Sequence, residues 1–337
     1  MRNVIIFCGT LAAVAVAAAF TTREATTDRI TEPMHTRDGI TIEKSLLYNQ
    51  HTLENTFPYE GGTRSFRFDK MRDRLFTLDS IQQGSVRWGV LQNRKNWNGM
   101  PPNVKEFTTN EYHAVADRYG VERRQSAPLY AIGEYGSQPP ERYGRDGSLV
   151  KLLGHNADST AWRVESFNAP GHWEVPHKYV KPISTTRFDK VVMVDRTNQD
   201  IATLERAPVQ GRHAGSTVAG EHWLIRSMNP CTTGAHQPPH AFPTPVGMFV
   251  IQDQTPKMMY NNGGPVIVGF APWASRFTNG AFLHGVPVNN PSGAIVEYLS
   301  TLGTIPRSHE CVRNASSHAK FIYDWAPLNA SIVFVYD

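Results

Sequence analysis

Short apolar runs separated by turn residues dominate the chain from about residue 107 onward. Trp162 and Val164, followed by Trp173 and Val175, alternate with polar positions on either side of a Pro-Gly turn, as in strands with one buried face. Further strands are predicted at 190–207 (two strands around a turn), 221–228, 247–254, 265–272 and 331–337, and helices at 290–303 and 314–327. The pattern predicts a mainly β protein in which two packed sheets carry one or two helices.

The segment 21–105 has a different pattern, because it is polar and contains few regular alternations. One stretch within it shows an approximate helical stripe of apolar residues, formed by Phe68, Met71, Leu75, Phe76 and Leu78. This stripe predicts a partly helical layer packed on the segments that follow. An extended linker is the alternative interpretation of the region, and the sequence does not choose between the two.

The first 20 residues are typical of an export signal. Arg2 precedes an uncharged apolar run from Val4 to Phe20, and small residues stand at Ala17 and Ala19. This arrangement predicts a signal peptide over 1–20, cleaved near Ala19. The run is close to the minimum length that spans a bilayer, so an uncleaved signal would tether the protein to the membrane. In both cases the remaining chain is expected in the periplasm or cell envelope.

Composition narrows the class of partner. A chain of 337 residues with 40% hydrophobic content can bury a sizeable core, and its length suggests two or three domains. The formal net charge of +4, without a long Lys/Arg block, argues against a nucleic-acid partner. Only Cys231 and Cys311 remain after the signal, so the cysteines do not form a disulfide framework. The sequence does not indicate an oligomeric state.

The stretch SHECVRN, residues 308–314, is the strongest candidate for a catalytic site in the sequence. A cysteine attacks an acyl carbon as the thiolate, so it needs a base and hydrogen-bond donors for the oxyanion. We expect Cys311 to begin a helix, with the amides of His309, Glu310 and Cys311 as the donors. His284 ends an apolar run and precedes Gly285, so it is the candidate base.

These residues resemble the signature of the L,D-transpeptidase (YkuD) catalytic domain, in which His-Gly is followed by Ser-His-Gly-Cys, an apolar residue and Arg or Asn. The resemblance includes the turn Pro243–Gly247 and the tripeptide Ala271-Pro272-Trp273, and it covers 187–337. Upstream, residues 106–185 more loosely resemble a bacterial SH3-like domain, which would bind cell-wall peptides or serve as a spacer. The expected organisation is therefore a signal, an N-terminal region over 21–105, an SH3-like barrel and a YkuD-like β-sandwich.

The family resemblance implies roles for individual residues. Cys311 would be the nucleophile and His284 the general base, with its imidazole oriented by the Gly285 carbonyl. Ser308 and His309 would be the family's hydroxyl and second histidine before the cysteine. The residues expected to contact substrate are Arg313, Asn314, Trp273, Phe277 and Glu310. The resemblance implies no metal and no organic cofactor.

The implied reaction is the formation of 3→3 cross-links between peptidoglycan stem peptides. Cys311 would attack the carbonyl before a terminal D-alanine, and the thioester would be resolved by an amine of a neighbouring stem. Resolution by water would give an L,D-carboxypeptidase, and resolution by a free D-amino acid would give an exchange enzyme. A catalytically inactive wall-binding protein is the further alternative.

Glu310 departs from the family pattern, which has glycine there. If that position has a positive φ, glutamate costs on the order of 1 kcal/mol or more. Its carboxylate would also raise the thiol pKa unless a cation such as Arg313 or Arg307 pairs with it. The long segment 290–303 is a second departure, and it predicts either a lid or a surface insertion.

Cys231 admits two other interpretations. The Cys231-x4-His236-x3-His240 spacing allows a zinc site, although Pro238-Pro239 break any helix there and no HExxH accompanies it. A disulfide between Cys231 and Cys311 would silence the nucleophile.

Overall fold

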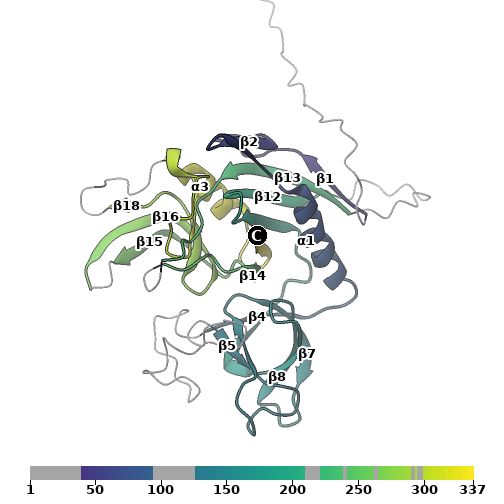
Figure 1. Ribbon diagram of the computed structural model, residues 1–337. Coiled ribbons are helices and arrows are strands. Elements are labelled where there is room, and N and C mark those ends of the chain that lie inside the picture. The colour runs from purple at the N-terminus through teal and green to yellow at the C-terminus, as the bar shows by residue number, and fades with distance from the viewer. Residues whose placement is uncertain are drawn as a thin grey trace, which may run out of the picture. The chain divides into compact units, whose positions relative to one another are not determined.

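The computed structural model describes residues 39–93, 126–208, 221–237, 241–261, 265–289, 293 and 299–337. In these residues it contains two α-helices and several β-sheets (Figure 1), which confirms the prediction of a mainly β protein with one or two helices. No helix in the described ranges is long and apolar enough to cross a bilayer. The predicted signal peptide and most of the predicted helix at 290–303 lie outside the described residues; Leu299–Thr301 form a short 3-10 turn, η3.

A six-stranded sheet forms the centre of the larger part of the fold. In spatial order its strands are β1 (Ile40–Lys44), β13 (Glu221–Pro230), β12 (Asp200–Arg206), β11 (Lys190–Asp195), β20 (Ser331–Tyr336) and β14 (Gly247–Val250). The β1–β13 and β11–β20 pairs are parallel, and the other pairs are antiparallel. Strand β1 comes from the predicted N-terminal region, so that region completes this sheet.

The two faces of the six-stranded sheet bury different clusters. On β11, Val191 and Met193 belong to one cluster, while Val192 and Val194 belong to the other, as alternation along a strand requires. Helix α1 (Phe68–Ile81) covers the first face with Met71, Leu75 and Leu78, whereas Phe76 is 45% exposed. The helical stripe is therefore real, with Phe76 on its solvent side. The small hairpin of β2 (Thr56–Tyr59) and β3 (Gly62–Ser65) precedes α1.

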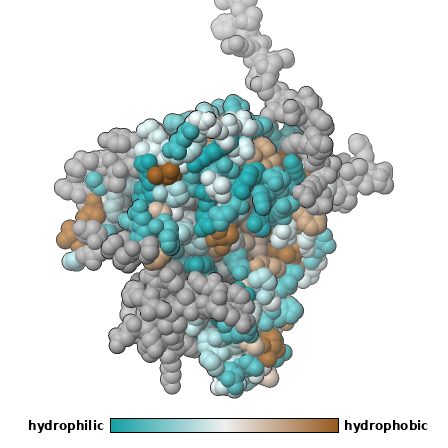
Figure 2. Space-filling view, in the orientation of Figure 1, coloured by the Kyte–Doolittle hydropathy of each residue, from teal (hydrophilic) through white to brown (hydrophobic). Residues whose placement is uncertain are grey.

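A second sheet packs on the other face. Its strands are β15 (Asp253–Asn261), β16 (Ile267–Thr278), β17 (Ala281–His284) and β19 (Val312–Arg313), and β18 (Val288–Asn289) pairs with β16. Helix α3 (Ser316–Trp325) lies in the predicted helical stretch and packs on β16 and β17. Figure 2 shows apolar surface at the end of the β15–β16 hairpin, where Met259, Val266 and Ile267 are exposed.

The segment between α1 and β11 forms a five-stranded sheet. Its strands, in spatial order, are β10 (Val180–Ile183), β4 (Trp88–Leu91), β7 (Leu149–His155), β8 (Ala161–Ser166) and β9 (Gly171–Pro176). The two-stranded sheet of β5 (Ser126–Leu129) and β6 (Arg142–Arg145) and the 3-10 turn η2 (His177–Tyr179) accompany it. Strand β4 lies before the predicted start of the barrel at residue 106. The relation of this unit to SH3 domains stays a prediction.

Candidate active site

Two distant motifs meet where β17 and β19 pair in parallel. Leu283 aligns with Val312, and His284 aligns with Arg313. Leu283 and Val312 both lie in the core cluster between the two sheets. Because side chains alternate along a strand, His284 is directed to the opposite face of the sheet, and we expect the same of Cys311, which directly precedes Val312. The pairing thus brings the candidate base close in register to the residue before β19, the candidate nucleophile.

Cys311 does not begin a helix, so that prediction is wrong. It directly precedes β19, and α3 starts only at Ser316; a helix dipole therefore does not act on the sulfur. The thiol is half-buried and donates a hydrogen bond to the Gly280 carbonyl at 3.6 Å. Burial raises the pKa of the Cys311 thiol to about 11, with Glu310 adding to the rise, while the Phe282 backbone N–H and Arg313 oppose it.

His284 is held in one orientation. Its Nδ1 donates to the Gly285 carbonyl at 2.7 Å, and its side chain is buried, with the residue 3% exposed. A carbonyl only accepts, so Nδ1 carries the proton and the Nε2 of the neutral ring can accept one. The Gly285 amide in turn donates to the Pro272 carbonyl at 2.8 Å. A Cβ on Gly285 would lie 2.8 Å from the Pro272 ring. Only a glycine allows this close approach.

Ser308 fixes the loop before the cysteine. Its hydroxyl donates to the Cys311 carbonyl and accepts the Glu310 amide at 3.3 Å. The Ser308 amide donates to the Thr233 carbonyl, and the Ser308 carbonyl accepts the Ala235 amide. Ser308 is buried and His309 is exposed, so Ser308 can only position the loop, whereas His309 is accessible from solvent.

The amides near the sulfur differ in their bonding. The Glu310 amide is bound to the Ser308 hydroxyl. Within the described ranges, the amides of His309 and Cys311 have no hydrogen-bond partner. These two, rather than all three predicted amides, are the donors that an oxyanion at this position would meet.

Glu310 adopts a backbone conformation that favours glycine, with φ of 122°. Thr244 holds it there, since its hydroxyl donates to the Glu310 carbonyl at 2.8 Å and accepts the Gly234 amide at 2.8 Å. A Cβ on Gly234 would lie 2.8 Å from the Glu310 Cα, so the two chains touch. Such a conformation costs about 1–3 kcal/mol for a residue other than glycine.

Residues 189–335 match the family model of the L,D-transpeptidase catalytic domain, YkuD. These residues form a YkuD domain. No curated protein matches the chain.

Several solved structures are similar to this chain. The L,D-transpeptidase from Mycobacterium smegmatis is 14% identical over 56% of this chain and 91% of its own, with a TM-score of 0.32. An L,D-transpeptidase from Mycobacterium tuberculosis H37Rv is 12% identical over 75% and 91%, with a TM-score of 0.32. A fused Zn-dependent amidase/peptidase/peptidoglycan-binding domain-containing protein from Clostridium acetobutylicum ATCC 824 is 17% identical over 44% of this chain, with a TM-score of 0.30. The chain spans about half of that protein, 52%.

Three of the expected substrate contacts lie elsewhere in the YkuD domain. Phe277 is fully buried and packs on Phe249, with ring centroids 5.7 Å apart. Asn314 is also fully buried and donates to the Val312 carbonyl. Trp273 packs on Tyr323 of α3, at 5.5 Å between ring centroids. Phe277 and Asn314 offer no surface to a substrate, so for them the prediction is wrong.

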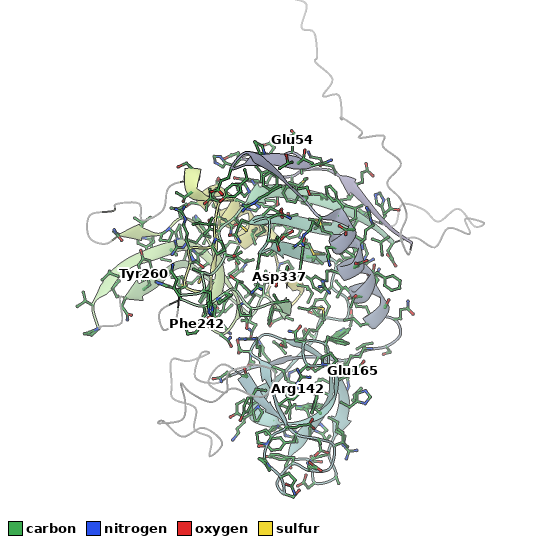
Figure 3. The ribbon with its side chains drawn as sticks, viewed as in Figure 1. Glu54, Arg142, Glu165, Phe242, Tyr260 and Asp337 are labelled. Carbon is green, nitrogen blue, oxygen red and sulfur yellow. The ribbon has the colours of Figure 1, made fainter. Side chains whose placement is uncertain are left out.

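Arg313 and Glu310 do lie at the site. Both charges act on the thiol, and Arg313 also lowers the pKa of Tyr260, which burial raises. Tyr260 lies on β15 (Figure 3) and its hydroxyl donates to the Val288 carbonyl at 3.4 Å. The Arg313 charge is therefore within electrostatic range of both the nucleophile and the β15–β16 hairpin.

Cys231 is buried in the apolar cluster behind β17 and forms no disulfide. Thr232 bridges Arg313 in antiparallel register, so Cys231 and Cys311 are offset by three residues, or about 10 Å along the strands. This exceeds the Cα separation of a disulfide. Among the described residues, no group of three His, Cys, Asp or Glu side chains could hold a metal; His240 of the proposed zinc spacing lies outside them.

Sequence reasoning missed the residues that contact the thiol through their backbone. The Gly280 carbonyl and the Phe282 amide act on the sulfur, and a backbone contact leaves no signal in side-chain identity. Thr244 was visible inside the Pro243–Gly247 motif, but its role in holding Glu310 depends on a long-range contact.

Proposed function

We propose that the protein is an exported cysteine-dependent L,D-transpeptidase that acts on peptidoglycan stem peptides in the periplasm or cell envelope. The parallel pairing of β17 with β19, which brings His284 close in register to Cys311, carries this proposal. The YkuD domain over 189–335 supports the acyl-transfer chemistry. The apolar run from Val4 to Phe20 supports export.

The first step is attack by Cys311 on the carbonyl that precedes the terminal D-alanine of a donor stem. With a thiol pKa of about 11, only about one molecule in 10⁴ carries a thiolate at neutral pH. The thiol must therefore lose its proton during the attack, and the Nε2 of His284 accepts it. The Nδ1 bond to Gly285 keeps the imidazole in the tautomer that this step requires.

The tetrahedral intermediate places negative charge on the former carbonyl oxygen. The amides of His309 and Cys311 donate to it, and Ser308 keeps both amides in place through its bonds to the loop. When the intermediate collapses, the carbon–nitrogen bond breaks and His284 returns the proton to the departing D-alanine amine. The thioester is then attacked by a side-chain amine of a neighbouring stem, which releases Cys311 and forms a 3→3 cross-link.

The same acyl-enzyme would give an L,D-carboxypeptidase with water as the acceptor, or an exchange enzyme with a free D-amino acid. One observation favours a different function. Glu310 combines a φ of 122° with a charge that raises the thiol pKa, and both effects reduce the reactivity of the site. A wall-binding protein without activity is the second candidate for this reason.

Acylation separates these candidates. The purified protein is incubated with a carbapenem and analysed by intact mass spectrometry, and we expect an adduct on the wild type and on Cys231→Ala but not on Cys311→Ala. Cys231 is the matched control because it is the other cysteine among the described residues. Muropeptide mass spectrometry then identifies the acceptor, since dimers, trimmed stems and exchanged stems differ in mass. A wild type that stays unmodified, yet sediments with sacculi, would support the wall-binding protein.

A further inference from the structure

The turn between β6 and β7 joins the upstream unit, which contains the five-stranded sheet and is called the barrel below, to the YkuD domain through one carboxylate. Asp146 is fully buried, and its Oδ1 accepts the Asn93 amide at 2.9 Å. Its Oδ2 accepts three donors from the YkuD domain: Gln252 Nε2 at 3.1 Å, Arg276 Nη1 at 2.7 Å and the Asn279 amide at 2.9 Å. One side chain of the barrel therefore binds three positions around the end of β16.

The backbone of the same turn continues this contact. The Thr278 hydroxyl donates to the Asp146 carbonyl at 2.5 Å, and the Val250 amide donates to the Gly147 carbonyl at 2.9 Å. Gly147 has a φ of +84°, and a Cβ there would lie 1.8 Å from the Phe277 carbonyl oxygen. The two backbones are in contact, which leaves the turn between β16 and β17 no room to move toward the barrel.

The other side of this turn faces the nucleophile. Asn279 and Gly280 connect β16 to β17, and the Gly280 carbonyl accepts the hydrogen bond of the Cys311 thiol. The Phe282 amide, two residues farther along, also acts on the sulfur. Asp146 thus binds Asn279 directly, and the residue after Asn279 contacts the thiol.

We propose that Asp146 is a positioning residue for Cys311, through which the barrel holds the β16–β17 turn against the nucleophile. Its part in the reaction rests on the proposed function, but its effect on the thiol does not. Asparagine at this position keeps the volume and one oxygen but turns the other oxygen into a donor. That NH₂ group would face donors rather than acceptors, and Arg276, which is 4% exposed, would lose its counter-charge.

The test compares Asp146→Asn with Asp79→Asn in the full chain. Asp79 also pairs with an arginine whose side chain is 7% exposed, Arg206, but it lies on α1, and its carboxylate accepts from Arg206 and Trp223. Two rates are measured on folded protein: alkylation of Cys311 by iodoacetamide as a function of pH, and acylation by a carbapenem. We expect Asp146→Asn to shift the alkylation profile toward the ordinary thiol range, because the freed sulfur is hydrated, while acylation slows about tenfold or more. Asp79→Asn should leave both rates unchanged.

Alkylation profiles of Asp146→Asn and wild type that coincide would overturn the proposal, and so would equal changes in Asp79→Asn. If Asp146→Asn does not fold, Thr278→Val removes only the bond to the Asp146 carbonyl and should shift the profile in the same direction by a smaller amount. A wild type that is never acylated would contradict the proposed function alone, since the alkylation measurement still reports the effect of Asp146.

Discussion

Replacement of Glu310 by glycine should make the protein more stable and its nucleophile more reactive. The φ of 122° costs glutamate about 1–3 kcal/mol, and glycine removes this strain. Glycine also increases the conformational entropy of the unfolded chain, which offsets about 0.4–1 kcal/mol. The expected net gain in the free energy of unfolding is therefore about 0.5–2 kcal/mol.

The pKa of the Cys311 thiol should fall when the charge of Glu310 is removed. Its pKa rises from 9.0 to about 11, and burial is the largest cause while Glu310 is a smaller one. Removal of the carboxylate should therefore lower the pKa by about one unit or less, toward 10. A shift of one unit raises the thiolate fraction at neutral pH about tenfold.

Glu310→Gln separates the two effects, because it removes the charge but keeps a side chain at the strained position. Urea unfolding measures stability, and the pH profile of Cys311 alkylation measures the thiol pKa, with Cys311→Ala as the background. We expect both variants to lower the pKa, but only Glu310→Gly to gain stability. A glycine variant that is less stable than wild type would refute the strain argument, and unchanged alkylation profiles in both variants would refute the electrostatic one.

Three other results should follow from the structure. His284→Ala should slow carbapenem acylation about 10²–10⁴-fold, because the thiol has lost its proton acceptor; an unchanged acylation rate would exclude His284 as the base. The free energy of unfolding should fall as the pH drops from about 6.5 to about 3, because burial lowers the pKa of His318 from 6.5 to about 3 and the unfolded chain binds the proton first. The loss is at most about 5 kcal/mol, and urea titrations at several pH values should show a flatter dependence for His318→Gln. Phe277→Ala should lower the free energy of unfolding by about 3–5 kcal/mol in the same assay, because Phe277 lies in the core. The folded variant should keep the acylation rate of the wild type. A free energy of unfolding equal to that of the wild type would contradict the placement of Phe277 in the core.

The sequence predicted the class of fold well, whereas the roles of His284 and Cys311 stay predictions. The alternating runs became strands, and β17, which ends at His284, pairs with β19, which directly follows Cys311. The order of the motifs along the chain allows this pairing to be predicted, because the fold of the family determines which segments pair. The stripe at Phe68–Ile81 also became a helix, since a period of 3.6 is a local property.

The errors concern properties that local sequence does not contain. Val312 and Arg313 form a short strand because β17 lies beside them, so the helix after Cys311 starts five residues later than expected. Phe277 is large and apolar, but its position on β16 places it in the core cluster between the two sheets. Register depends on the partner strand, and the partner is distant in sequence.

Strand β1 has a consequence for any shortened form of the protein. It pairs with β13 over five residues and forms the edge of the six-stranded sheet, and α1 covers the apolar face beside it. A fragment that starts at Arg187 would keep the whole match to the family but expose the unpaired edge of β13 and the surface under α1. Open edges and bare apolar faces of this kind promote aggregation. The unit that stays soluble is therefore larger than the unit that sequence similarity delimits.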